Sequence, residues 1–171
     1  MRRPHFFPVV LALLLCLCAT ASAQTQTFAD DNVDFTFDLP SATWRLVARP
    51  DDVRATVEFV YGDRSDGYLR VRKETTGRGT SADDMARQDQ DQKLRFRPGY
   101  VEGKQERFAG NMSGTTTSYE FTSGGKPMLG RVYYLSAPDG PIYTLHFTGA
   151  RDKLSRIRNQ TDSIARTLKQ K

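Results

Sequence analysis

The chain has 171 residues, which is enough for one domain with a single hydrophobic core. The formal net charge is +5, or +3 once Arg2 and Arg3 are removed, and the basic residues are scattered. This argues against a nucleic-acid-binding protein and predicts a solvated basic surface with, at most, a weak preference for anionic surfaces or acidic partners. Cys16 and Cys18 are the only cysteines, so residues 24–171 contain no thiol nucleophile, disulfide or cysteine-ligated metal.

The N-terminal segment has the three parts of a secretory signal peptide. Arg2 and Arg3 form a basic start, residues 9–19 are almost entirely apolar, and residues 21–23 (Ala-Ser-Ala) suit signal peptidase. A twin-arginine signal is the alternative. We therefore expect a signal peptide at 1–23, cleavage before Gln24, and a secreted or periplasmic domain at 24–171. No stable membrane insertion is expected after cleavage, because no later apolar run approaches the roughly 20 residues that a membrane span requires.

The first half of the expected domain contains alternating strands after a loose N-terminus at 24–27. Apolar and polar residues alternate with the period of a half-buried strand. The expected strands lie at 33–39, 43–48, 54–61 and 68–74. In the last of these, Leu69 and Val71 point inward, and Arg70, Arg72 and Lys73 are expected to protect a sheet edge.

A helix is expected over residues 80–96. Ser81 and Asp84 have the spacing of a capping box, and Pro98-Gly99 follows as a stop signal. Lys93, Arg95 and Arg97 would lie at the negative end of the helix dipole. The apolar face is thin and includes Leu94 and Phe96, so we expect this helix to lie on the surface and to be anchored mostly at its ends.

Four further strands and a second helix complete the expected domain. The strands fall at about 100–108, 115–122, 127–136 and 141–148, joined by short connections that require antiparallel neighbours. The helix carries an apolar stripe from Leu154 to Leu168 that would pack on Tyr143, Leu145 and Phe147. The order ββββ-α-ββββ-α predicts an α+β fold, an antiparallel sheet flanked by two main helices.

Two segments resemble the PsbP-like family. "FTFDLPSATWRL" (35–46) resembles its first strand, with Phe-x-Phe, proline and tryptophan, and "YTLHFTG" (143–149) followed by "IARTLK" (164–169) resembles its final strand and helix. Thr167-Leu168 stand where that family typically has Ser-Phe. The resemblance covers Phe28 to Lys169 and implies the α/β/α sandwich shared by PsbP, Mog and periplasmic DcrB-like proteins, whose members mostly act as non-catalytic accessory or binding proteins. It supplies no binding motif to carry over.

No catalytic, cofactor-binding or metal-ligating residue is predicted. His146 is the only histidine after residue 23, and without a histidine or cysteine partner it is interpreted as a structural or surface residue. Four carboxylates, Asp30, Asp31, Asp34 and Asp38, are close in sequence, but Asp34 and Asp38 lie along a strand rather than around a calcium loop, so no calcium site is predicted. The loop 75–81, "TTGRGTS", lacks P-loop spacing and is interpreted as a flexible connection.

We therefore expect a non-enzymatic exported PsbP-like protein, an accessory factor that binds another envelope protein, with no cofactor and no nucleic acid. The alternative is a periplasmic carrier or sensor of a small apolar or anionic ligand, held in a groove beside the second helix and lined by strand aromatics. A carboxylate-based hydrolase is a third, more distant possibility.

Overall fold

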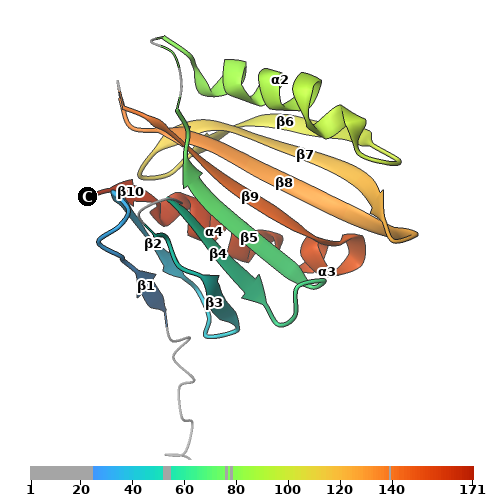
Figure 1. Cartoon of the computed structure of the whole chain (residues 1–171), viewed down its shortest axis with the longest axis horizontal. Helices are drawn as coiled ribbons and strands as arrows, with labels where there is room; N and C mark the ends of the chain where they lie inside the picture. The colour runs from blue at the N-terminus through green and yellow to red at the C-terminus, as the bar shows by residue number, and fades with distance from the viewer. Residues whose placement is uncertain (1–24, 52–54, 76, 78, 139) are drawn as a thin grey trace, which may run out of the picture.

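A seven-stranded antiparallel sheet forms the middle layer of the molecule (Figure 1). The computed structural model describes residues 25–51, 55–75, 77, 79–138 and 140–171, so the expected signal peptide lies outside the described residues. In spatial order the strands are β3 (Trp44–Ala48), β4 (Thr56–Tyr61), β5 (Gly67–Lys73), β9 (Ile142–Ala150), β8 (Lys126–Ser136), β7 (Ser113–Ser123) and β6 (Val101–Ala109).

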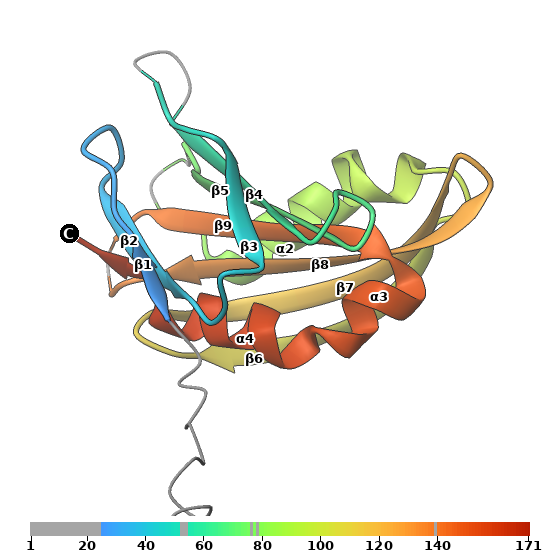
Figure 2. The ribbon, with the colours of Figure 1, turned by 90° about the horizontal axis from the view of Figure 1, so that it is seen from below.

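A second, small sheet and the helices cover the two faces of the large sheet. The small sheet has the order β1 (Gln26–Phe28), β2 (Phe35–Leu39) and β10 (Lys169–Gln170). One face of the large sheet carries α2 (Ala82–Gln92), and the other carries α3 (Arg151–Arg156) and α4 (Arg158–Thr167) (Figure 2). The predicted α+β fold, an antiparallel sheet flanked by helices, is confirmed.

The larger core lies between the sheet and the C-terminal helices. Tyr143, Leu145 and Phe147 alternate toward this face and belong to the same buried cluster as Ile164 and Leu168. The predicted packing of the C-terminal stripe is therefore confirmed. The stripe belongs to two helices, however, because α3 ends at Arg156 and α4 begins at Arg158. No glycine or proline marks this break in the sequence.

The N-terminal residues form a short strand, β1, that pairs with the next strand along the chain. Gln26–Phe28 pair with β2, and the Phe28 side chain is buried in the core, whereas we had expected a loose start at 24–27. The Thr36 hydroxyl also donates a hydrogen bond to the Phe28 carbonyl at 2.5 Å. The sequence did not reveal this strand because its three residues are too few to show an alternating pattern, and it forms by pairing with β2.

The first helix is shorter than expected. Its capping box forms as predicted, with Ser81 and Asp84 exchanging hydrogen bonds, but α2 ends at Gln92. A 3-10 turn, η2 (Leu94–Phe96), follows, so Lys93 and Arg95 do not lie in the last turn of α2. Leu94 is buried as expected, whereas Phe96 is 74% exposed and does not join an apolar face. The helix is not anchored mostly at its ends as expected, because Met85, Ala86 and Asp89 are buried along its length.

The interior position of β5 corrects a second prediction. Arg70, Arg72 and Lys73 do not protect a sheet edge, because β5 lies between β4 and β9. Strand order of this kind depends on long-range pairing, which short connections alone do not reveal. Arg70 and Arg72 instead stand on the face of the sheet that carries α2.

Candidate functional site

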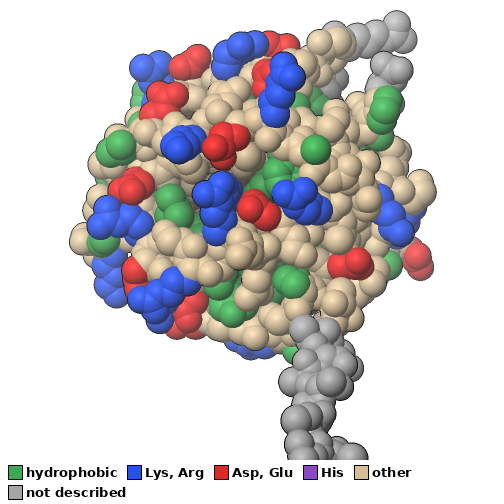
Figure 3. Space-filling view, turned by 180° about the vertical axis from the view of Figure 1, so that it is seen from behind, with side chains coloured by type: hydrophobic (Ala, Val, Ile, Leu, Met, Phe, Trp, Pro, Cys, Tyr) green, Lys and Arg blue, Asp and Glu red, His purple; other side chains and the backbone are tan. Residues whose placement is uncertain are grey.

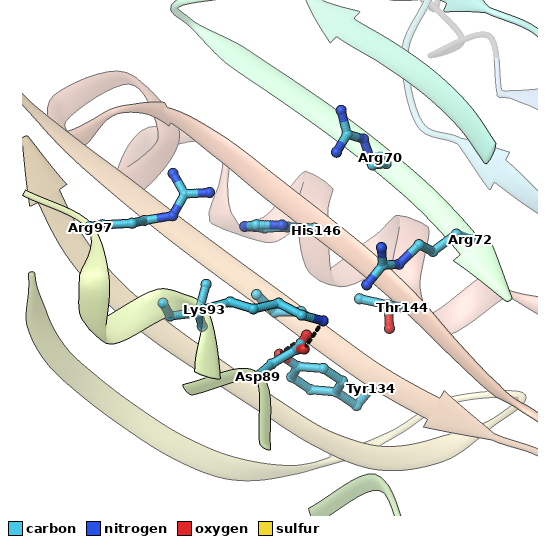
Figure 4. Close-up of a pocket in the computed structure, with 10 residues that line it drawn as sticks. Arg70, Arg72, Asp89, Lys93, Arg97, Tyr134, Thr144 and His146 are labelled. Atoms are coloured by element: carbon cyan, nitrogen blue, oxygen red, sulfur yellow. Dashed lines mark hydrogen bonds and ion pairs between the residues drawn. The ribbon is translucent and has the colours of Figure 1, made fainter. Parts of the chain in front are cut away.

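A pocket of about 180 Å³ lies where α2 and η2 meet the sheet (Figure 4). We call it the α2 pocket. Its lining is mostly polar, with Leu94 and Val132 as the aliphatic members. The lining residues are Arg70, Arg72, Asp89, Lys93, Leu94, Arg97, Val132, Tyr134, Thr144 and His146.

The register of three neighbouring strands builds the floor of the α2 pocket. Arg70 on β5 stands opposite His146 on β9, and His146 stands opposite Val132 on β8. In the next row, Arg72 stands opposite Thr144, which stands opposite Tyr134. Because side chains alternate between the two faces of a strand, both rows point to the same side of the sheet. The α2 side adds Asp89 and Lys93, and Arg97 follows η2.

The α2 pocket has an excess of positive charge in its lining. Four cations, Arg70, Arg72, Lys93 and Arg97, face one carboxylate, Asp89. Figure 4 shows Arg97 on one side of His146 and the two arginines of β5 on the other. The field inside a partly enclosed site is less screened than at the open surface, so this arrangement favours an anionic group.

Two of the cations are held by carboxylates outside the lining. Arg70 contacts Glu58 at 3.0 Å, and Arg72 contacts Glu74 at 2.6 Å. The hydroxyl of Thr144 also donates to Glu74 at 2.6 Å. These contacts fix the directions of the guanidinium groups. They leave other N–H donors of each guanidinium available for a ligand, since arginine has five.

Arg97 differs from the other cations of the lining. Within the described part of the chain, no ion pair joins it to a carboxylate. Its guanidinium carbon instead lies 4.6 Å from the ring centroid of Phe121 and 5.7 Å from that of Tyr119. Such cation–π contacts position the group without neutralising it. Arg97 is therefore the cation in the lining that a bound anion would most directly compensate.

Asp89 is the one acid of the lining and is only 6% exposed. It accepts a hydrogen bond from the Tyr134 hydroxyl at 3.1 Å and from the Lys93 ammonium at 2.5 Å. Burial, together with the charge of Asp89, raises the pKa of Tyr134. A buried carboxylate needs such partners, and the pair with Lys93 closes one end of the α2 pocket.

His146 is half-buried at the centre of the lining and lies against Tyr119. Its Nε2 is 2.7 Å from the Tyr119 hydroxyl. Burial, reinforced by the charge of Arg97, lowers the pKa of His146 to about 3, and burial raises the pKa of Tyr119 to about 12. Both groups are therefore neutral at pH 7, and they contribute hydrogen bonds rather than charge.

A glycine makes the Tyr119–His146 contact possible. Gly130 lies opposite Tyr119 in the register of β7 and β8. A Cβ atom at Gly130 would come within 2.1 Å of the Tyr119 ring, so the ring occupies the space that any other side chain would fill. The tyrosine can thus lie flat on the sheet and reach His146 on β9.

The groups that line the α2 pocket are suited to holding an anion. A histidine with a pKa of about 3 is a weak general base at neutral pH, and a tyrosine with a pKa of about 12 is not a phenolate there. Guanidinium and ammonium groups around a small cavity are well suited to hold a carboxylate or phosphate.

Comparisons with known proteins connect the chain to one fold. No family model and no curated protein matches the sequence. Among solved structures, PsbP from Synechocystis sp. PCC 6803 superposes with a TM-score of 0.59 at 15% identity, over 90% of this chain and 96% of that one. The chain has the PsbP-like fold.

Two further structures share the PsbP-like fold. LpqN, which is involved in cell envelope biogenesis of Mycobacterium tuberculosis, matches with a TM-score of 0.50 at 16% identity, over 85% of this chain and 90% of that one. A crystal structure from Bacteroides thetaiotaomicron VPI-5482 matches with a TM-score of 0.58 at 11% identity over 85% of this chain. The chain spans about half, 48%, of that protein. At such identities the likeness concerns the fold alone.

The segments that resemble the PsbP-like family meet in the core of this fold. Trp44 from the first segment packs on Phe147 from the second, with ring centroids 5.9 Å apart. The indole N–H of Trp44 also donates to Gln160 of α4 at 3.1 Å. Phe35 packs on Tyr143 at 5.6 Å. These contacts join the first strands of the fold to β9 and α4. None of these residues lines the α2 pocket.

The lining residues were not predicted as a site. His146 was interpreted as structural or as a surface residue; it lines the α2 pocket. The alternation of "YLRVRKE" did place Arg70 and Arg72 on the other face of the strand from Leu69 and Val71. The residues beside them in the lining come from β9, and β8 follows as the next strand, which the sequence did not reveal. The ligand groove was expected beside the C-terminal helix, whereas the α2 pocket lies beside the first helix.

The acidic and loop candidates have other surroundings. Asp30 pairs with Arg49 at 3.2 Å, Asp34 pairs with Lys73 at 2.7 Å, and Asp38 accepts a hydrogen bond from Thr27 at 2.7 Å. These three carboxylates thus have separate partners. Of the loop 75–81, residues 76 and 78 lie outside the described residues.

The face of the molecule seen from behind (Figure 3) carries charges of both signs. Figure 3 shows basic and acidic side chains interleaved there, with apolar residues between them. Within the described ranges, no helix has the length and apolar character that would cross a membrane.

Proposed function

We propose that this protein is an exported, non-enzymatic accessory protein that binds the anionic group of a ligand in the α2 pocket. The observation that carries the proposal is Arg97, which lines the α2 pocket beside a neutral His146 and forms no ion pair within the described part of the chain. The other three cations of the lining, Arg70, Arg72 and Lys93, are held in place by Glu58, Glu74 and Asp89. An anion that entered would gain charge-assisted hydrogen bonds from fixed donors. Export is supported by the signal-peptide pattern at 1–23 and by the envelope role of LpqN, which shares the fold.

The size of the α2 pocket limits what it can enclose. Sites that bury a whole drug-sized molecule measure roughly 300–1,000 Å³. The volume here is about 180 Å³, equivalent to roughly six water molecules at about 30 Å³ each. A phosphate or carboxylate group fits this space, and the remainder of a larger ligand would extend outside.

Calorimetric titration of the mature protein with inorganic phosphate and with acetate tests this proposal. Arg97→Gln removes the cation without a carboxylate partner, and Arg95→Gln is the matched control, since Arg95 pairs with Asp91 outside the lining. A hydrogen bond to a charged group contributes about 1.5–3 kcal/mol, so Arg97→Gln should weaken binding about tenfold or more. The control should change it by less than about twofold. Equal affinity in both variants, or no binding of either anion, would contradict the proposal.

A second candidate is an accessory role carried out by binding another envelope protein without any small ligand. It is favoured by the shared fold with PsbP and with LpqN. Native mass spectrometry of protein purified from its own envelope separates the two roles. Added mass that disappears in the Arg97→Gln variant supports the anion-binding role. A bare chain recovered with a stoichiometric protein partner supports the second candidate.

A further inference from the structure

We propose that the α2 pocket binds the phosphate headgroup of an anionic lipid, and that Phe96 inserts into the membrane surface beside it. This inference rests on the proposed anion-binding function and adds the source of the anion. The segment 93–101, "KLRFRPGYV", carries the observations. It contains three basic residues and no acidic one, and three of its members, Lys93, Leu94 and Arg97, line the α2 pocket.

Exposed apolar side chains gather in the same segment. Among the described residues, three large hydrophobic side chains are strongly exposed, namely Phe96 at 74%, Val101 at 59% and Val47 at 51%. Two of the three therefore fall within 93–101. Phe96 is in the 3-10 turn itself, between the lining residues Leu94 and Arg97. Transfer of an exposed aromatic ring from water into an apolar phase lowers the free energy of the system.

The basic residues around Phe96 favour an anionic bilayer surface as the apolar phase that the ring enters. Lys93 and Arg95 pair with Asp89 and Asp91, yet their side chains are 55% and 57% exposed. Arg97 has no carboxylate in an ion pair with it within the described part of the chain. Basic side chains that flank an aromatic ring are characteristic of segments that lie on anionic bilayers. The aliphatic parts of the arginine and lysine side chains can lie beside the inserted ring while their charged groups stay at the level of the lipid headgroups. Electrostatic complementarity thus indicates an anionic lipid surface as the occupant.

The dimensions of the α2 pocket agree with a lipid headgroup. A volume of about 180 Å³ holds the phosphate and leaves the acyl chains outside, where the bilayer would contain them. Arg70 and Arg97 present guanidinium groups from two sides of the lining, a geometry suited to phosphate oxygens. The docking is interfacial, at the level of headgroups, and involves no membrane-spanning segment.

Sedimentation with vesicles tests the inference on the mature protein. Vesicles of equimolar phosphatidylglycerol and phosphatidylcholine should bind the protein, and vesicles of phosphatidylcholine alone should bind it far less. Phe96→Ser should lower the partition coefficient about tenfold. Val47→Ser is the matched control, because Val47 is similarly exposed on the edge strand β3, and it should change partitioning by less than about twofold. Thermal unfolding of each variant checks that it is folded.

Further experiments test whether the α2 pocket itself binds the lipid headgroup. Arg97→Gln should abolish the preference for phosphatidylglycerol, and soluble glycerol 3-phosphate should compete with vesicles for the wild-type protein. In a Phe96→Trp variant, added anionic vesicles should shift the tryptophan emission to the blue beyond the background of the buried Trp44.

The outcomes separate this inference from the function on which it rests. Binding of free phosphate without binding of anionic vesicles overturns the inference and leaves the proposed function in place. Vesicle binding that is unaffected by Phe96→Ser or by glycerol 3-phosphate also overturns it, as does a protein partner found to cover Phe96. Failure of both phosphate and vesicles to bind overturns the inference and the proposed function together.

Discussion

Replacing His146 with asparagine should remove part of the acid sensitivity of the fold. Burial and the charge of Arg97 lower the pKa of His146 to about 3 in the folded protein, whereas an unfolded histidine has a pKa of about 6.5. Between these values the unfolded chain holds a proton on the imidazole and the native chain does not. The free energy of unfolding therefore decreases as the pH falls below about 6.5, and the histidine has no such effect above it.

The size of this effect follows from the separation of the two pKa values. Each pH unit within the window changes stability by about 1.36 kcal/mol, so the 1.5 units between pH 6.5 and pH 5 amount to about 2 kcal/mol. Asp34 and Glu58, whose pKa values are lowered in the fold, also make the protein less stable as pH falls. They are present in wild type and variant alike, so they cancel in the difference between the two proteins.

Urea unfolding of wild type and His146→Asn at pH 7 and pH 5 provides the measurement. At pH 7 the wild type should be the more stable, because asparagine cannot reproduce the contact with Tyr119. At pH 5 this advantage should shrink by about 2 kcal/mol or reverse. A difference in unfolding free energy that is the same at both pH values would refute the reasoning, since it would mean that the histidine titrates alike in the folded and unfolded chains.

Three other substitutions test separate parts of the structure by urea unfolding. Gly130→Ala places a Cβ against the Tyr119 ring and should cost about 1–3 kcal/mol; a neutral result would show that the ring moves freely. Ser81→Ala removes the capping box with Asp84 and should cost about 1 kcal/mol, largely restored by Ser81→Thr; no loss would contradict the cap. Ile164→Ala empties a fully buried position and should cost about 2–5 kcal/mol, and a loss below 1 kcal/mol would argue against the packing of α4 on the sheet.

Local patterns in the sequence predicted most of the strands because alternation depends on neighbouring residues. The capping box of Ser81 and Asp84 was predictable for the same reason. The order of the strands was not, because β5 pairs with β9, about 75 residues further along the chain. That pairing moves Arg70 and Arg72 from a supposed edge to the interior of the sheet.

The α2 pocket was harder to predict than the fold. Its lining comes from β5, β8, β9, α2 and the residues around η2, and no two of the pocket arginines or lysines form a recognised motif. A lone histidine gives no sign of a site in the sequence, because the partner of His146 is Tyr119 on another strand. The Tyr119 ring reaches His146 through the space left by Gly130. Positions like these become visible only when strand register is known.

The most direct test of the central claim is an NMR titration of the mature protein with inorganic phosphate. We expect saturable shifts at the guanidinium of Arg97 and the ring of His146, with smaller ones at Arg70 and Arg72. In Arg97→Gln, the shifts at His146, Arg70 and Arg72 should need about tenfold more phosphate to reach half of their full size. Shifts confined to other parts of the surface, or a linear drift that never saturates, would contradict the claim that the α2 pocket is an anion-binding site.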